Sequence, residues 1–314
     1  MLYINKLDEM KKIKNIRARR KQIINKMEKN LENLNEKSKN YINDAIKLLD
    51  IKCGMENIIS IILFGSQSSG IPSKISDCDL LIILNNSLSK DEIYQLNKYF
   101  LALELKHGFL NQPTGLIDRL FIAFQKATGM FVSHFIVNLK IWKKKKFYKI
   151  FNVNKIFSYL LAPRDIVFHN VINTSKILYK ANNIESLTRY FYFSPKAIEM
   201  IKSIIMNYLL TVGSILVMPF SPKSIKYLLE SVKWSLRTSN YYIFEDSKPL
   251  KKITSRFLSF ENNTKKRRNT SQYFKTFFEL RNDPKYEFGF FFKSLYRILK
   301  IHIQGIIYRT ILNA

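Results

Sequence analysis

The segment 58–84 constrains the fold more than any other part of the chain. Two apolar, β-branched runs, residues 58–64 and 80–84, flank a connection that is rich in glycine and serine. Short apolar runs between turn residues are typical of buried strands. The second run is preceded by Asp77 and Asp79, which are two positions apart. Because successive side chains on a strand point to opposite faces, we expect both carboxylates on one face, with Cys78 on the other.

This carboxylate pair and the connection before it predict a site for a metal ion and phosphate. Two carboxylates this close repel each other, and a divalent cation relieves the repulsion. Mg²⁺ is commonly held by one or two carboxylates together with substrate phosphates and water. Gly65 and Ser66 follow the first run directly and can offer backbone N–H groups and a hydroxyl to phosphate oxygens. Lys74, in the polar turn before Asp77, is a further candidate for binding a triphosphate.

The order of these residues resembles the signature of the polymerase-β-type nucleotidyltransferases. That signature is an apolar residue, Gly-Ser, a spacer, then Asp-x-Asp and an apolar run, which here is Phe64-Gly65-Ser66 followed by Asp77-Cys78-Asp79. The form of residues 64–70, Phe-Gly-Ser-x-x-x-Gly, is most similar to the small antitoxin and antibiotic-modifying members. The resemblance implies an α/β (α+β) core with a small mixed sheet. It also implies transfer of a nucleoside monophosphate from an NTP, with ATP binding and Mg²⁺ or Mn²⁺, to an acceptor hydroxyl on an RNA end, a protein or a small molecule.

The same resemblance implies a third carboxylate on the next core strand, and none is evident. Residues 130–139 are predicted to be that strand, and they contain no acid. His134 is a candidate general base, since a neutral imidazole suits that role near pH 7; the alternative is a hydrogen-bonded core histidine. Asp118 is a candidate if residues 116–124 form a strand, and a surface acid paired with a base if they form a helix. A third alternative is a protein that binds nucleotide without turning it over.

Helices are predicted on both sides of this core. Heptad-like apolar spacing and many basic residues over 1–50 indicate a long amphipathic N-terminal helix. The nucleotidyltransferase core is then expected over 51–155, with a helix over 90–107 capped by Ser89. From residue 156 to 314 the sequence shows no clear strand alternation, which predicts an all-helical domain.

Two stretches of the predicted helical domain have alternatives. Residues 197–217 are apolar, but Glu199, Lys202 and Asn207 leave an uncharged part shorter than the roughly twenty residues that a membrane span needs, so a buried bundle helix with no membrane contact is favoured. Residues 261–269 are predicted to be a polar basic loop.

Charge and cysteine content bear on partners and location. The 314 residues carry a formal net charge of +28, which points to an anionic partner. The basic runs 143–146 and 265–268 motivate the alternative function, a catalytically inactive nucleotide- or nucleic-acid-binding regulatory protein on the same scaffold. The chain is also rich in Lys, Asn and Ile together, so a compositional bias can account for part of the charge. Two cysteines, Cys53 and Cys78, form no disulfide framework, and the sequence shows no signal peptide, so a cytoplasmic protein is expected.

Overall fold

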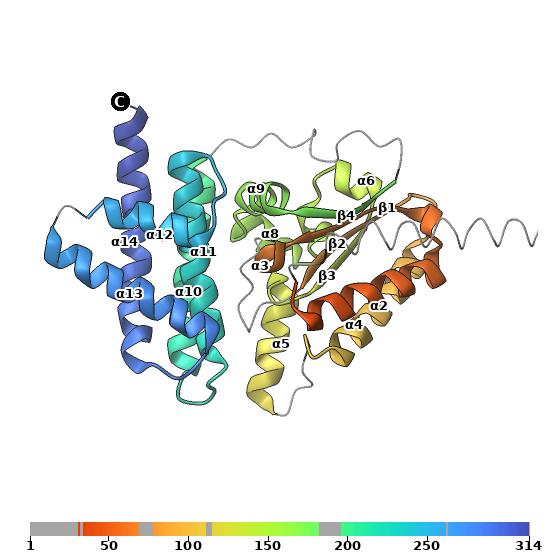
Figure 1. The fold of residues 1–314 in the computed structure, drawn as a ribbon, viewed down its shortest axis with the longest axis horizontal. Coiled ribbons are helices and arrows are strands. Elements are labelled where there is room, and N and C mark those ends of the chain that lie inside the picture. The colour runs from red at the N-terminus through yellow and green to blue at the C-terminus, as the bar shows by residue number, and fades with distance from the viewer. Residues whose placement is uncertain are drawn as a thin grey trace, which may run out of the picture.

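The computed structural model describes residues 31, 34–68, 78–110, 115–181, 196–261 and 263–313. A sheet with its flanking helices forms one part of the molecule, and a bundle of helices forms the other (Figure 1). The strands lie in the order β3-β2-β1-β4, where β1 pairs antiparallel with β2 and β4, and β2 pairs parallel with β3. Their bounds are β1 Ile58–Phe64, β2 Asp79–Leu84, β3 His134–Asn138 and β4 Lys176–Lys180. The predicted α/β core with a small mixed sheet is therefore confirmed.

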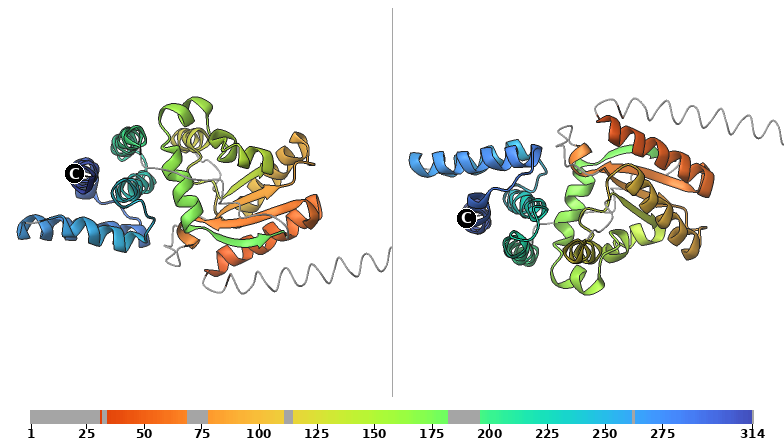
Figure 2. Two further views of the ribbon diagram at one scale, coloured as in Figure 1. Left: turned by 90° about the horizontal axis from the view of Figure 1, so that it is seen from above. Right: turned by 90° about the horizontal axis from the view of Figure 1, so that it is seen from below.

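Helices cover both faces of this sheet, as Figure 2 shows from two directions. On one face, Leu80 and Ile82 pack in a core with α2 (Glu36–Cys53) and α4 (Lys90–Lys106). On the other face, Leu81 and Ile83 pack in a second core with shorter helices. Those helices are α6 (Leu139–Lys143), α7 (Phe147–Ile150), α8 (Lys155–Leu160) and α9 (Arg164–Thr174). Burial on both faces explains the unbroken apolar run of β2.

Local signals determine several of the helix boundaries. Ser89 accepts a hydrogen bond from the backbone N–H of Glu92 at 3.2 Å, and the Glu92 carboxylate accepts one from the N–H of Ser89 at 2.7 Å. This reciprocal capping box starts α4 where the sequence predicts it. The segment that was open to two interpretations is a helix, α5 (Leu116–Thr128).

Three expectations about the rest of the chain need correction. The expected helix over 1–50 is not continuous in its described part, because Asn35 has extended backbone and caps a new helix, α2; residues 1–30 lie outside the described residues. The sheet includes β4, so the core continues well past the expected boundary at residue 155. The expected basic loop over 261–269 is mostly the first part of helix α13 (Thr264–Asn282), capped by Asn263.

The bundle consists of long helices around α11 (Ser224–Phe244), which packs against both α10 (Ala197–Val217) and α14 (Phe288–Asn313). Helix α12 (Leu250–Ser259) and α13 complete it. The bundle contacts the core domain through Tyr227, whose ring stacks on Phe121 of α5 at 4.6 Å between centroids. The Tyr227 hydroxyl also accepts a hydrogen bond from Gln125 at 3.0 Å. These contacts place α11 directly opposite the core domain.

Helix α10 is the one described helix that is long and apolar enough to cross a membrane. Its most apolar part has a mean hydropathy of 1.7 and is 39% buried, and core helices of soluble proteins can be equally long and apolar. Its polar side chains bind α11: Ser203 donates to Thr238 at 2.8 Å, and the Thr211 and Ser231 hydroxyls are 2.7 Å apart. These contacts fit the predicted bundle helix.

Candidate active site

The turn after β1 places a glycine directly against an acidic side chain of β2. Phe64 and Asp79 are paired across the two antiparallel strands, and α3 (Gly65–Ser68) begins at the next residue. Gly65 has φ +77°, and a Cβ atom at this position would lie 2.0 Å from Oδ2 of Asp79. Both the backbone angle and the close approach therefore require glycine here. The hydroxyl of Ser68 donates to the carbonyl of Gly65 at 2.9 Å and closes the turn.

This turn opens into a cavity of about 860 Å³ between the core domain and the bundle. Gly65, Ser66 and Asp79 line its core side, so the structure brings these three candidate site residues together. The other members of the predicted motif, Lys74 and Asp77, lie outside the described residues.

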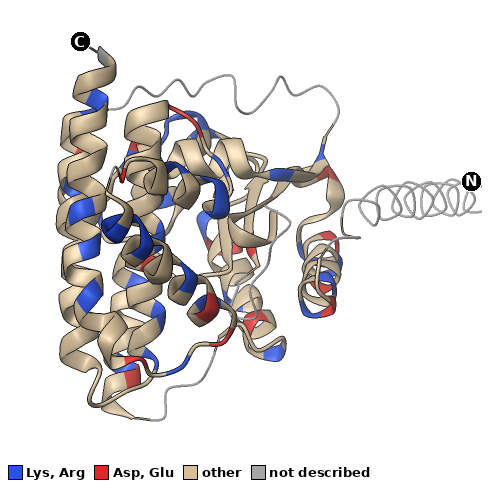
Figure 3. Ribbon diagram, turned by 60° about the vertical axis from the view of Figure 1, so that its left-hand side comes forward, with Lys and Arg blue, Asp and Glu red and all other residues tan. Residues whose placement is uncertain are grey.

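A row of charged side chains on α11 lines the opposite wall. Lys226, Glu230, Lys233 and Arg237 follow steps of four, three and four residues, so they share one face of the helix. Glu230 forms an ion pair with Lys233, and its Oε1 lies 3.4 Å from an amino group of Arg281 on α13. Figure 3 shows that Lys and Arg positions recur along the bundle helices, while Asp and Glu are fewer there. The wall that faces Asp79 is thus strongly basic.

The charges of the two walls affect one another. Burial is the main reason that the pKa of Arg237 falls to about 10; Arg281 lowers it further, while Glu230 and Asp79 oppose the fall. The guanidinium therefore stays charged at neutral pH and lies within electrostatic reach of Asp79. Burial would raise the pKa of Glu230, but the attraction of Lys233 and Arg281 outweighs it and holds that pKa below its usual value. Glu230 is accordingly an ionised carboxylate that holds two basic side chains on the cavity wall.

The two candidate bases lie elsewhere. His134 is paired with Leu80 in the parallel ladder, so it faces the α4 side of the sheet, opposite to Asp79. There its Nδ1 is 2.7 Å from Oε1 of the buried Glu104. This is the hydrogen-bonded core histidine of the alternative interpretation, and the hypothesis of a base at His134 was wrong because the strand register points it away from the cavity.

Asp118 also lies apart from the cavity lining. It is in the first turn of α5 and accepts a hydrogen bond from Nζ of Lys223 at 2.8 Å. Asp118 is therefore an acid paired with a base on a helix, as the second interpretation predicts. It does not supply the third carboxylate. Within the described residues, no group of three or more His, Cys, Asp or Glu side chains is arranged to hold a metal ion.

One segment of the chain matches a known protein family. Residues 45–113 match the family model of the nucleotidyltransferase domain. This segment is a nucleotidyltransferase domain. The match includes both strands of the Gly-Ser and Asp-x-Asp signature, so the resemblance in the sequence is confirmed. No curated protein sequence matches the chain.

A solved structure has a similar fold over most of the chain. The spectinomycin adenyltransferase AAD(9) from Enterococcus faecialis, crystallised with ATP and spectinomycin, is similar with a TM-score of 0.50 at 11% sequence identity. The similarity covers 85% of this chain and 98% of that chain. At this identity the likeness concerns the fold, in which a nucleotidyltransferase domain is followed by a helical part.

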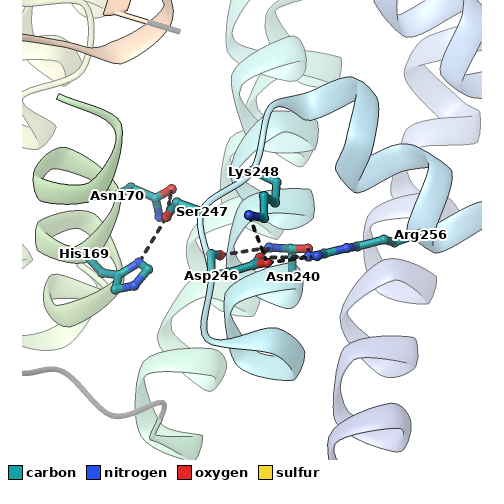
Figure 4. A network of polar contacts seen from close by, with 7 residues as sticks. All are labelled: His169, Asn170, Asn240, Asp246, Ser247, Lys248 and Arg256. Carbon is teal, nitrogen blue, oxygen red and sulfur yellow. Dashed lines mark hydrogen bonds and ion pairs between the residues drawn. The ribbon is translucent and has the colours of Figure 1, made fainter. Parts of the chain in front are cut away.

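The loop between α11 and α12 fixes one end of the cavity against helix α9 (Figure 4). The Ser247 hydroxyl lies 3.1 Å from Nδ1 of His169 and 3.4 Å from Oδ1 of Asn170, both on α9. The neighbouring Asp246 accepts two hydrogen bonds from Arg256, at 2.8 and 2.9 Å. This network holds the start of α12 in place, where Lys248 and Lys251 line the cavity.

Sequence reasoning missed the basic wall of α11 and α13. The signal in the sequence was the charged row of α11, whose helical spacing is visible in residues 226–237. A row of this kind usually marks a solvated surface, and only the placement of α11 beside the nucleotidyltransferase domain turns it into a cavity wall.

Proposed function

We propose that this cavity is the active site of a divalent-metal-dependent nucleotidyltransferase, which transfers a nucleoside monophosphate from an NTP to an acceptor hydroxyl. The observation that carries the proposal is the Gly65–Asp79 contact, which faces the charged row of α11 across one cavity. A cavity of about 860 Å³ is large enough for a nucleotide and part of an acceptor.

The triphosphate would be bound from both walls. The backbone of Gly65 and the Ser66 hydroxyl approach it from the turn after β1. From the bundle, Lys233, Arg237 and Arg281 supply positive charge in a largely buried setting, where charge-assisted hydrogen bonds to phosphate are strong. The position of these basic groups opposite Asp79 supports this assignment.

Asp79, with Asp77 from the undescribed segment, would hold Mg²⁺ or Mn²⁺. Carboxylate oxygens suit these hard cations, and Asp79 lies on the cavity wall, so the donor chemistry fits. When bound, such an ion neutralises charge on the triphosphate and on the leaving pyrophosphate.

The proposed reaction is a displacement at the α-phosphorus. The acceptor oxygen forms a bond to this phosphorus, and the bond from phosphorus to the oxygen that bridges the β-phosphate breaks. Pyrophosphate leaves with the electron pair of that bond, where Lys233 and Arg237 stabilise its charge. The proton of the acceptor hydroxyl passes to water at the cavity mouth, which the exposed Lys251 and Lys275 line.

Transfer of label from an α-³²P-labelled NTP, with Mg²⁺ and pools of candidate acceptors, tests this function. We expect Asp79→Asn to reduce transfer at least about a thousandfold, because it removes a charged metal ligand. Asp118→Asn is the matched control, since it also neutralises one acid but lies outside the cavity lining, and it should retain activity. Equal activity in the wild type and the Asp79→Asn variant would refute the proposal.

A second candidate function rests on the exposed basic surface. Lys265, Lys266, Arg267 and Arg268 are all exposed on α13. A regulatory protein that binds nucleic acid through them would lose affinity steeply with salt and would be indifferent to Asp79→Asn. RNA-binding titrations at two salt concentrations separate this candidate from the enzyme. For either function we propose a cytoplasmic location, with α10 acting as a bundle helix, which its polar contacts with α11 support.

A further inference from the structure

The cavity has a marked imbalance of charge. Within the described residues, seven Lys and Arg side chains line it, against three Asp and Glu side chains. The basic residues are Lys226, Lys233, Arg237, Lys248, Lys251, Lys275 and Arg281. The acidic residues are Asp79, Glu230 and Glu279. This composition limits the chemistry of any second substrate that enters the cavity with the nucleotide.

Each described acid of the lining already has a basic neighbour. Asp79 interacts electrostatically with Arg237. Glu230 forms ion pairs with Lys233 and Arg281, and Glu279 lies 4.0 Å from Nζ of Lys275. Every described carboxylate of the wall therefore already has a basic neighbour, and none is left to bind a positively charged acceptor.

Basic groups also remain at both ends of the cavity. Lys226 and Lys251 form no ion pair within the described part of the chain, and Lys248 has only a contact of 4.0 Å with Asp246. Lys226 is in the first turn of α11, and Lys251 is in the first turn of α12, after the end of α11. Lys226 and Arg237 are eleven positions apart on α11, which is about 16 Å along the helix axis. An acceptor therefore meets a basic side chain whichever end of the cavity it occupies.

We infer that the acceptor is a phosphate-bearing hydroxyl compound and not a cationic aminocyclitol such as spectinomycin. This inference rests on the proposed transferase function and names the substrate class of that same site. Lys233, Arg237 and Arg281 bind the phosphates of the NTP, and Lys226 or Lys251 binds the phosphate of the acceptor. Trp234, Phe131 and Phe278 of the lining supply ring faces for a sugar or base. A sugar phosphate and an RNA 3′ end share this chemistry, so the test has an arm for each.

The test measures acceptor binding to the full chain, saturated with Mg²⁺ and a non-hydrolysable ATP analogue. The first arm compares glucose 6-phosphate with glucosamine, which have a similar size but opposite charge. The second arm compares a hexa-adenylate RNA with spectinomycin. We expect at least one anionic probe to bind more than tenfold more tightly than the cationic probe of its arm, and the arm that shows the preference identifies the source of the phosphate.

Two double variants make the test specific to the cavity. Lys226→Gln with Lys251→Gln removes the two basic groups at the ends, and we expect it to weaken anion binding at least tenfold while ATP-analogue binding changes less than twofold. Lys252→Gln with Lys293→Gln is the matched control, because it removes two exposed charges outside the lining and should have no effect. The inference is overturned if neither anion is preferred, or if the two double variants behave alike.

Failure of this inference is distinguishable from failure of the proposed function. If the chain does not bind the ATP analogue and transfers no Asp79-dependent label, the transferase function itself fails. If ATP binding and Asp79-dependent transfer are intact but cationic acceptors are preferred, the transferase function stands and only the acceptor class is wrong.

Discussion

Replacing Gly65 by alanine should slow the reaction strongly while leaving the protein folded. The backbone of Gly65 is left-handed, with φ +77°, and the added Cβ would lie 2.0 Å from Oδ2 of Asp79. Real Cβ atoms do not approach an oxygen so closely, so either the turn or the carboxylate must move. Because β1 and β2 are paired at Phe64 and Asp79, the carboxylate is the part that yields most readily.

The two expected effects have different sizes. The left-handed backbone costs a residue with a Cβ about 1–2 kcal/mol in the free energy of unfolding. A shift of the carboxylate by about 1 Å at the reacting centre costs roughly a hundredfold in rate, which corresponds to about 2.7 kcal/mol of transition-state stabilisation. The variant should therefore fold, melt at a lower temperature and transfer nucleotide about a hundredfold more slowly.

Gly54 offers a matched control. It has φ +74°, and a Cβ there would lie 2.2 Å from Oε1 of Glu56, an exposed side chain that can rotate away. Gly54→Ala should lose a similar 1–2 kcal/mol, which is about the cost of a left-handed alanine, and keep its transfer rate. Urea unfolding and the labelled-NTP assay on both variants provide the measurement. If Gly65→Ala is as active as Gly54→Ala, the contact with Asp79 has no role in positioning the carboxylate.

Three further predictions follow from other contacts. His134→Gln keeps a hydrogen-bond donor for Glu104 and should leave the transfer rate unchanged, whereas loss of a general base would reduce that rate at least about a hundredfold. Burial lowers the pKa of His302 to about 3, so below pH 6.5 the unfolded chain binds more protons than the folded chain, and stability falls as the pH is lowered. Urea unfolding should show a loss of up to about 2 kcal/mol from this residue between pH 6.5 and pH 5, and His302→Gln should remove that loss. Arg237→Gln should weaken ATP binding about tenfold by calorimetry, while Arg267→Gln, at an exposed position of α13, should not.

The parts of the site that depend on local sequence could be predicted. The apolar runs of β1 and β2, the glycine between them and the capping box of α4 each act through neighbours within a few residues. Such features follow from strand alternation and cap chemistry, so the core fold could be anticipated, and so could the placement of Gly65 and Ser66 at the end of β1 beside Asp79 on β2.

Which residues of β3 face the cavity could not be predicted in the same way. Whether His134 or its neighbour Phe135 faces the cavity depends on the register between β3 and β2, and a shift of one residue exchanges the two faces. The observed pairing of His134 with Leu80 directs His134 toward Glu104. The edge strand β4 was missed because it has only five residues, of which one is fully buried, so its sequence shows no clear alternation of apolar and polar residues.

The basic wall depends on contacts between segments that are distant in the sequence. The way α11 divides its faces between packing and the cavity bears on acceptor specificity. On α11, Leu228, Leu229 and Val232 face the bundle core, while the charged row that includes Lys233 and Arg237 faces the cavity. The packing that holds α11 in place is therefore carried by a different face from the one that meets the substrates. Substitutions in the charged row can change the charge of the cavity without disturbing the bundle core or the Gly-Ser and Asp-x-Asp signature. If the proposed function holds, the Gly-Ser and Asp-x-Asp signature would determine the transfer chemistry, and the charged row of α11 would determine the acceptor.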